Sequence, residues 1–168
     1  MFGAESTYQT SPAAVISRIN HGLFRRSIEN RFLTTFYGVL GRDGVFTYTN
    51  GGHNAPFLVS AAGVRRLETG GMVLGLFEQT AFDEETITLQ PGDFIVAFSD
   101  GVTEALNTTG DEYMDDRLLA SIERHRSVAG SAPPEFVASL LDDVRAFCDG
   151  ETPHDDITLL MVRYDGAR

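Results

Sequence analysis

Two places in the chain put a carboxylate at the end of an apolar, strand-like segment. The segment FIVAFSDGVTEA leads into Asp100, and the following Gly101 lets the backbone turn or approach another segment closely. The segment HDDITLLMV carries Asp155 and Asp156 directly before a second apolar run. If these strands are neighbours in one sheet, the carboxylates converge at its edge and repel one another unless a proton or cation neutralises them. Oxygen ligands alone favour a hard cation such as Mg²⁺ or Mn²⁺ over zinc.

Each feature also has a structural interpretation. Asp-Gly is a frequent turn pair, so Asp100 alone is typical of a turn residue. Acidic residues before an apolar strand can act as gatekeepers against aggregation, which is the alternative role of Asp155 and Asp156. Their joint occurrence at the ends of two apolar strands favours the metal site.

A third feature is the loop in TNGGHNAPFLV (residues 49–59). Its functional interpretation makes His53 a hydrogen-bonding or proton-transfer group beside the site. In the structural interpretation, the side chains of His53 and Asn54 hold a turn through hydrogen bonds to backbone. The sequence leaves both open.

Other catalytic chemistries are not indicated. The chain has no Walker or dinucleotide-type glycine loop and no Gly-x-Ser-x-Gly elbow, because Ser99 is followed by Asp-Gly. Its four histidines lack metal-ligand spacing, which argues against a histidine-rich zinc site. The single cysteine, Cys148, lies among apolar and acidic residues, so we expect a buried thiol and a reducing, cytoplasmic location.

The elements that must position these residues are mainly short strands. A helix is predicted over 12–28, capped by Ser11, with an apolar face at Val15, Ile16, Ile19 and Leu23. Segments 31–41 and 45–50 flank an Arg-Asp-Gly turn and predict a β-hairpin. The same pattern recurs as 56–60 with 64–68, and as 86–90 with 94–99, which indicates antiparallel sheets arranged as a sandwich.

The second half of the chain becomes helical. A short helix is expected behind Asp115 and Asp116, and a longer one over 133–148, ending before Gly150. The apolar segment 157–164 predicts a strand in the centre of its sheet. The expected fold class is α+β, with sheets covered by helices.

Composition limits the partners. The 13 basic and 24 acidic residues leave a net charge of −11, which argues against nucleic acid and anionic membrane as partners. No segment has the roughly 20 apolar residues of a transmembrane helix. We expect an irregular stretch over 1–10 and one domain over 11–168.

The ordered set RFLTTFYGVL, YTNGGHNAPFLV, LGL, LQPGDFIVAFSDGVTEALN and PHDDITLLMVRY resembles the SpoIIE-like branch of PPM-type serine/threonine protein phosphatases. The resemblance runs from about Ser11 to Tyr164. It implies an α/β/β/α sandwich with a binuclear Mn²⁺ or Mg²⁺ centre whose bridged water attacks phosphoserine or phosphothreonine directly. It also implies a role in bacterial signalling, with phosphorylated anti-sigma-factor antagonists as substrates.

Carried over by position, the resemblance makes Asp100 and Asp155 metal ligands. Asp156 is an adjacent or alternative ligand, and Gly101 is a further candidate. His53 falls in the Gly-His-Asn loop of the pattern without a defined catalytic role.

The sequence departs from the family pattern at its start. The pattern has an upstream strand ending in an Asp-Val-Ser-Gly-Lys-Gly-like loop, whose Asp bridges the metals, whereas MFGAESTYQT contains no Asp. We therefore expect an incomplete domain lacking the first strands, either a piece of a longer phosphatase or a protein that has lost its full site. Such a domain should bind two metals weakly and expose a sheet edge suited to homodimer formation.

Three function classes follow. The first is an active phosphatase, and the second is a non-catalytic phosphatase-like module that binds a partner or phosphoprotein. The third, an unrelated ligand-binding β-sandwich, requires the ordered motif match to be accidental.

Overall fold

The computed structural model describes residues 11–25, 32–130, 132–151 and 155–167. The chain forms two compact units, the first from residues 1–53 and 68–88 and the second from residues 54–67 and 89–168. Each unit contains one four-stranded sheet with helices, so the predicted α+β class is confirmed. The expected irregular stretch over 1–10 and the predicted ends of the first helix and first strand, at 26–28 and 31, lie outside the described residues.

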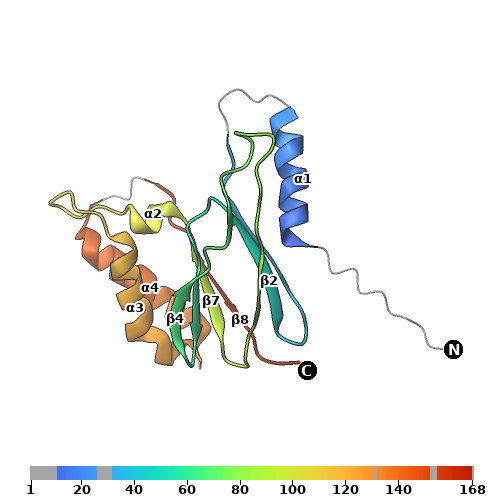
Figure 1. Ribbon diagram of the computed structural model, residues 1–168. Helices are drawn as coiled ribbons and strands as arrows, with labels where there is room; N and C mark the ends of the chain where they lie inside the picture. Colours follow the sequence, from blue (N-terminus) through green and yellow to red (C-terminus); the bar gives the residue numbers. More distant parts are fainter. Residues whose placement is uncertain (1–10, 26–31, 131, 152–154, 168) are drawn as a thin grey trace. The chain divides into compact units, whose positions relative to one another are not determined.

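The first unit is built around β2, a strand that is buried almost throughout. β1 pairs with it antiparallel as the predicted hairpin, while β6 runs antiparallel and β5 parallel to it along its other side. Helix α1 lies beside β1 and β2 (Figure 1). The bounds are α1 Pro12–Arg25, β1 Thr35–Leu40, β2 Val45–Gly51, β5 Gly70–Gly71 and β6 Glu85–Thr88.

Helix α1 begins as predicted, and Ile16 and Leu23 of its predicted apolar face pack in the core, but Ile19 does not. The Ser11 hydroxyl oxygen accepts a hydrogen bond from the Ala14 N–H at 3.1 Å, which is N-capping geometry. Ile16 is buried, but Ile19 is 41% exposed and its neighbour Asn20 is only 1% exposed. Asn20 is buried because its amide binds the backbone of the loop at 75–78, and a polar residue with such partners can replace an apolar one on a buried face.

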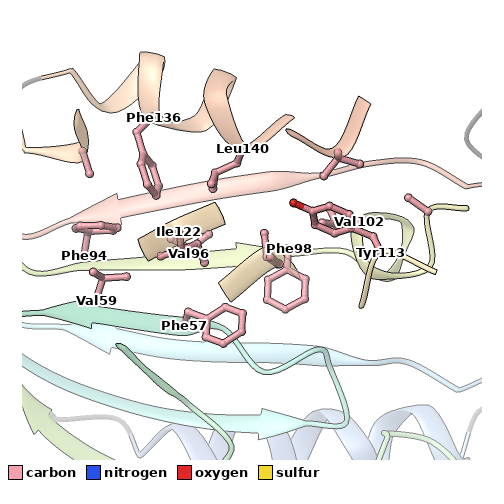
Figure 2. Packing of buried hydrophobic residues seen from close by; sticks show 14 of the residues in the cluster. Phe57, Val59, Phe94, Val96, Phe98, Val102, Tyr113, Ile122, Phe136 and Leu140 are labelled. Atoms are coloured by element: carbon pink, nitrogen blue, oxygen red, sulfur yellow. The ribbon is translucent and has the colours of Figure 1, made fainter. Parts of the chain in front are cut away.

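The second unit has an antiparallel sheet in the order β4-β3-β7-β8. Helices α3 and α4 lie side by side against one of its faces (Figure 1). Figure 2 shows Phe136 and Leu140 of α4 directed toward the buried side chains of the sheet, among them Phe94 and Val96. The bounds are β3 Phe57–Ser60, β4 Gly63–Arg66, β7 Phe94–Phe98, α2 Asp100–Thr103, α3 Met114–Ala129, α4 Pro133–Cys148 and β8 Leu159–Arg163.

Three predictions in this region need correction. Segments 86–90 and 94–99 do not pair with each other, because β6 joins the first sheet and β7 the second. The helix after Asp115 is not short, since α3 has 16 residues. β8 is not central: it lies at the end of the strand order, and its alternate residues Leu160 and Val162 are 55% and 42% exposed. Apolar character along a strand therefore does not by itself identify a central position.

The predicted burial of the Cys148 thiol is confirmed. Cys148 is the last residue of α4 and is buried in the core between the helices and the sheet. Burial, followed by the nearby charge of Glu151, raises the pKa of its thiol, which is the opposite of what a nucleophilic cysteine requires. Among the described residues, no helix has the length and apolar character needed to cross a bilayer.

Candidate metal centre

The two carboxylate segments lie side by side in the second unit. β7 and β8 are antiparallel neighbours with Phe98 opposite Leu159, so the end of β7 and the start of β8 share one edge of the sheet. One step further, the Ser99 N–H donates to the Thr158 carbonyl oxygen at 3.0 Å. Asp100 follows this contact as the first residue of α2. The two strands are therefore neighbours in one sheet, which is the condition stated for convergence of the carboxylates.

Gly101 is explained by close backbone approach. A Cβ atom placed on this buried glycine would lie 2.5 Å from the carbonyl oxygen of Asp156 and 3.0 Å from its carbonyl carbon. Contacts that short are not found for real Cβ atoms, and the neighbouring atoms belong to rigid backbone. The segment after β7 can pass this close to residues 155–156 only because residue 101 has no side chain.

Asp100, Asp155 and Asp156 are exposed, and the first two accept hydrogen bonds from the backbone of the next residue. One oxygen of Asp100 accepts a hydrogen bond from the Gly101 N–H at 3.0 Å, and one oxygen of Asp155 accepts from the Asp156 N–H at 2.7 Å. Within the described part of the chain, no arginine forms an ion pair with Asp100, Asp155 or Asp156. Open carboxylate oxygens on two adjacent segments fit the ligand chemistry of a hard divalent cation.

The ligand set is nevertheless incomplete. The described residues contain no group of three or more His, Cys, Asp or Glu side chains placed to hold one ion. Within these residues, the segments at Asp100 and Asp155 bring two backbone segments with carboxylates to one edge of the sheet.

His53 belongs to the first unit. Its backbone N–H donates to the Asn50 side-chain oxygen at 2.7 Å, and the Asn50 amide donates to the His53 carbonyl oxygen at 2.8 Å. Its ring nitrogen Nδ1 lies 3.3 Å from the Thr34 hydroxyl. A side chain therefore holds the His53 turn through hydrogen bonds to backbone, but it is that of Asn50. The structural interpretation named the wrong residues, because the printed contacts of the His53 ring and the Asn54 amide are with the side chains of Thr34 and Thr103.

Asn54 has a different role, which the sequence did not indicate. Its side-chain amide lies 3.4 Å from the Thr103 hydroxyl, and that hydroxyl donates to the Asp100 carbonyl oxygen at 3.2 Å. This chain of contacts links the start of the second unit to the short helix that bears Asp100. Ser99 was likewise missed as a contributor, although a serine between a strand and an Asp-Gly pair is well placed to bond neighbouring backbone.

Comparison with known proteins decides the family. The sequence model described as Stage II sporulation protein E (SpoIIE) matches residues 1–165 of this chain. The chain belongs to the SpoIIE family. It is 32% identical over 155 residues to "Phosphoserine phosphatase RsbU" of Bacillus subtilis, a match covering 90% of this chain and 45% of the relative. It is 28% identical over 133 residues to "Protein IcfG" of Synechocystis, covering 78% of this chain and 20% of that protein.

The chain thus spans less than half the length of either curated relative. Solved structures agree on the fold of this SpoIIE-family chain. The SiaA-PP2C domain of Pseudomonas aeruginosa matches with a TM-score of 0.80 at 16% identity, over 92% of this chain and 61% of that one. A structure of the PP2C phosphatase domain of SpoIIE from Bacillus subtilis, with a fragment of its regulatory domain, matches with a TM-score of 0.73 at 20% identity. The match covers 90% of this chain and 43% of that one.

Proposed function

We propose that this chain is a metal-dependent phosphatase domain that hydrolyses phosphoserine or phosphothreonine in a protein substrate, as part of bacterial signalling. The observation that carries the proposal is the placement of Asp100 beside Asp155 and Asp156 at one edge of the second sheet, in a chain of the SpoIIE family. The "Phosphoserine phosphatase" name of RsbU, a relative at 32% identity, supports the same reaction class.

Asp100 and Asp155 would hold the cation, with Asp156 and Gly101 as further candidates from the same two segments. Mn²⁺ or Mg²⁺ bound there would supply a water acidic enough to attack a phosphate ester at neutral pH. Among the solved structures of this fold is a SpoIIE phosphatase domain presoaked with Mn, which supports manganese as the first ion to test. The carboxylates keep at least one oxygen each for this purpose, because the hydrogen bonds to Gly101 and Asp156 engage only the other.

The substrate class that we propose is a phosphorylated protein of the anti-sigma-factor antagonist type. RsbU, and a mycobacterial structure of RsbU and RsbW domains of which this chain matches 43%, support it by relationship. The net charge of −11 argues against direct contact with nucleic acid or anionic membrane. A cytoplasmic location is part of the proposal, because the one cysteine is a buried free thiol.

A second candidate function is a non-catalytic module that binds a phosphoprotein. It is favoured by the described residues, which contain no group of three or more His, Cys, Asp or Glu side chains placed to hold one ion. The expected domain over 11–168 would then keep the fold and the two carboxylate segments without reaching the metal occupancy that turnover requires.

An assay of the chain with a phosphoserine peptide over a range of Mn²⁺ concentrations tests both candidates. Asp100→Asn and Asp155→Asn should abolish metal-dependent turnover, because each removes a charged ligand. Asp142→Asn is the matched control, since Asp142 is an exposed carboxylate on α4 that pairs with Arg145. Turnover that is the same with and without Mn²⁺, and the same in Asp100→Asn as in the unmodified chain, would exclude the proposed site. No turnover together with retained binding of the phosphopeptide would support the non-catalytic module.

We also propose that the β8 edge pairs with a second copy of the chain. β8 has one neighbour among the described strands, and Leu160 and Val162 expose apolar surface beside that edge. Light scattering should report a dimer that Leu160→Glu converts to a monomer. A monomer at all concentrations of the unmodified chain would exclude this interface.

A further inference from the structure

The hydroxyl of Ser99 joins the two carboxylate segments through both of its hydrogen-bonding functions. It donates to the Asp156 carbonyl oxygen at 2.9 Å and accepts from the Thr158 N–H at 2.9 Å. The Ser99 backbone N–H adds a third bond, to the Thr158 carbonyl oxygen. One residue at the end of β7 thus holds the backbone on both sides of Ile157.

A hydroxyl is suited to this position for a geometric reason. The regular β7–β8 ladder ends at the pair Phe98–Leu159, and the chain turns into α2 at Asp100. Beyond that pair, a side chain that donates and accepts at once can replace the missing ladder bonds. Alanine offers neither function, whereas threonine offers both.

The carboxylates themselves supply no attraction between the two segments. Asp100, Asp155 and Asp156 are all acidic, and no described arginine pairs with them. Gly101 permits the close approach but contributes no attraction of its own. Ser99 lies next to Asp100 in sequence and bonds the Asp156 peptide directly, so its hydrogen bonds join the backbones of the two acidic segments.

We infer that Ser99 is a positioning residue for the proposed metal centre: its hydroxyl holds the segment that carries Asp100 against the segment that carries Asp155 and Asp156. This inference rests on the proposed function. Removal of outer hydrogen bonds around metal ligands typically weakens metal affinity by about 10–100-fold. Ser99→Ala should therefore raise the Mn²⁺ dissociation constant by at least about tenfold, while Ser99→Thr keeps it near that of the unmodified chain.

The experiment measures Mn²⁺ binding by electron paramagnetic resonance, without substrate, for the unmodified chain, Ser99→Ala and Ser99→Thr. Ser139→Ala is the matched control, because the Ser139 hydroxyl is also half-buried and also bonds a backbone carbonyl, that of Glu135, within α4. We expect it to leave Mn²⁺ affinity unchanged. Equal affinity for Ser99→Ala and the unmodified chain, or an equal loss in Ser99→Thr and Ser99→Ala, would overturn the inference.

A metal-free measurement separates this inference from the proposed function. Hydrogen exchange in EDTA should show the Thr158 amide losing protection by on the order of tenfold in Ser99→Ala, with protection retained in Ser99→Thr and Ser139→Ala. If the unmodified chain binds no Mn²⁺, the proposed function fails, and exchange at Thr158 still decides whether Ser99 holds the segments. Unchanged exchange in Ser99→Ala would show that the hydroxyl does not hold them.

Discussion

Replacing Gly101 by alanine tests the close backbone approach on which the candidate site depends. The new Cβ would meet the Asp156 carbonyl oxygen at 2.5 Å, and ordinary contact begins at 3.4 Å, so the two segments must separate by about 0.9 Å. Overpacking of this kind typically costs about 1–3 kcal/mol, whereas alanine gains up to about 1 kcal/mol over glycine in a helix. We therefore expect Gly101→Ala to lower the free energy of unfolding by about 1–2 kcal/mol.

Gly22→Ala is the matched control. Gly22 lies within α1, is exposed, and has no atom within 4 Å of a placed Cβ. The same chemical change there should raise the free energy of unfolding by up to about 1 kcal/mol. Urea unfolding should give opposite signs for the two variants, and thermal midpoints should move by about 2–4 °C per kcal/mol for a chain of this size.

Whether Gly101→Ala lowers or raises the free energy of unfolding tests the close approach of Gly101 to the Asp156 backbone. A stabilised Gly101→Ala variant, matching Gly22→Ala, would mean that the Asp156 backbone is not where the structure places it, and the juxtaposition of the two carboxylate segments would fall with it. In Mn²⁺ binding, Gly101→Ala should also be weaker than the unmodified chain, because the enlarged spacing moves Asp100 away from Asp155.

Three further predictions concern the first unit, away from the carboxylates. Thr49→Val should raise the free energy of unfolding by about 1 kcal/mol, because the buried Thr49 hydroxyl has no hydrogen-bond partner among the described residues. A lower stability of Thr49→Val in urea would show that this hydroxyl does have a partner. Asn20→Ala should lower the free energy of unfolding by about 2–3 kcal/mol, because the Asn20 side chain binds the Phe77 carbonyl and the Gly75 N–H. The 75–78 loop of this variant should also be cleaved faster by a protease. Unchanged cleavage of the loop would show that Asn20 does not hold it. Burial, followed by the hydrogen bond to Glu85, raises the pKa of Tyr48 above its usual 10.0. The folded chain then retains a proton that the unfolded chain releases, so stability should decline as pH rises past about 10. Tyr48→Phe should show a smaller decline between pH 9 and pH 11, and an equal decline would assign the effect to other groups.

Elements with local signals were predictable from the sequence. Helix α4 has the predicted bounds, since a proline begins it and a left-handed residue, Asp149, followed by Gly150, ends it. The β1–β2 hairpin follows from its Arg-Asp-Gly turn, in which Gly44 has the positive φ that such turns require. These signals act between residues a few positions apart, so no tertiary information is needed to read them.

Partners distant in sequence were not predictable in the same way. β6 and β7 flank a tight turn, yet they join different sheets, because strand pairing depends on edges supplied by β2 and β3 elsewhere in the chain. The burial of Asn20 is another such case, since its partners lie in a loop 55 or more positions away.

For the candidate site, the sequence by itself determined which residues are candidates for metal binding and that each stands at the end of an apolar strand. The composition and order of the motifs also sufficed to indicate the SpoIIE family. Only the tertiary structure decided that β7 and β8 are neighbours, that Gly101 touches the Asp156 backbone, and that the Ser99 hydroxyl binds on both sides of Ile157. The physical reason is that strand ends are encoded by local residue patterns, whereas contact between two strand ends depends on the folding of the 50 or so intervening residues, α3 and α4 included, against one face of the sheet.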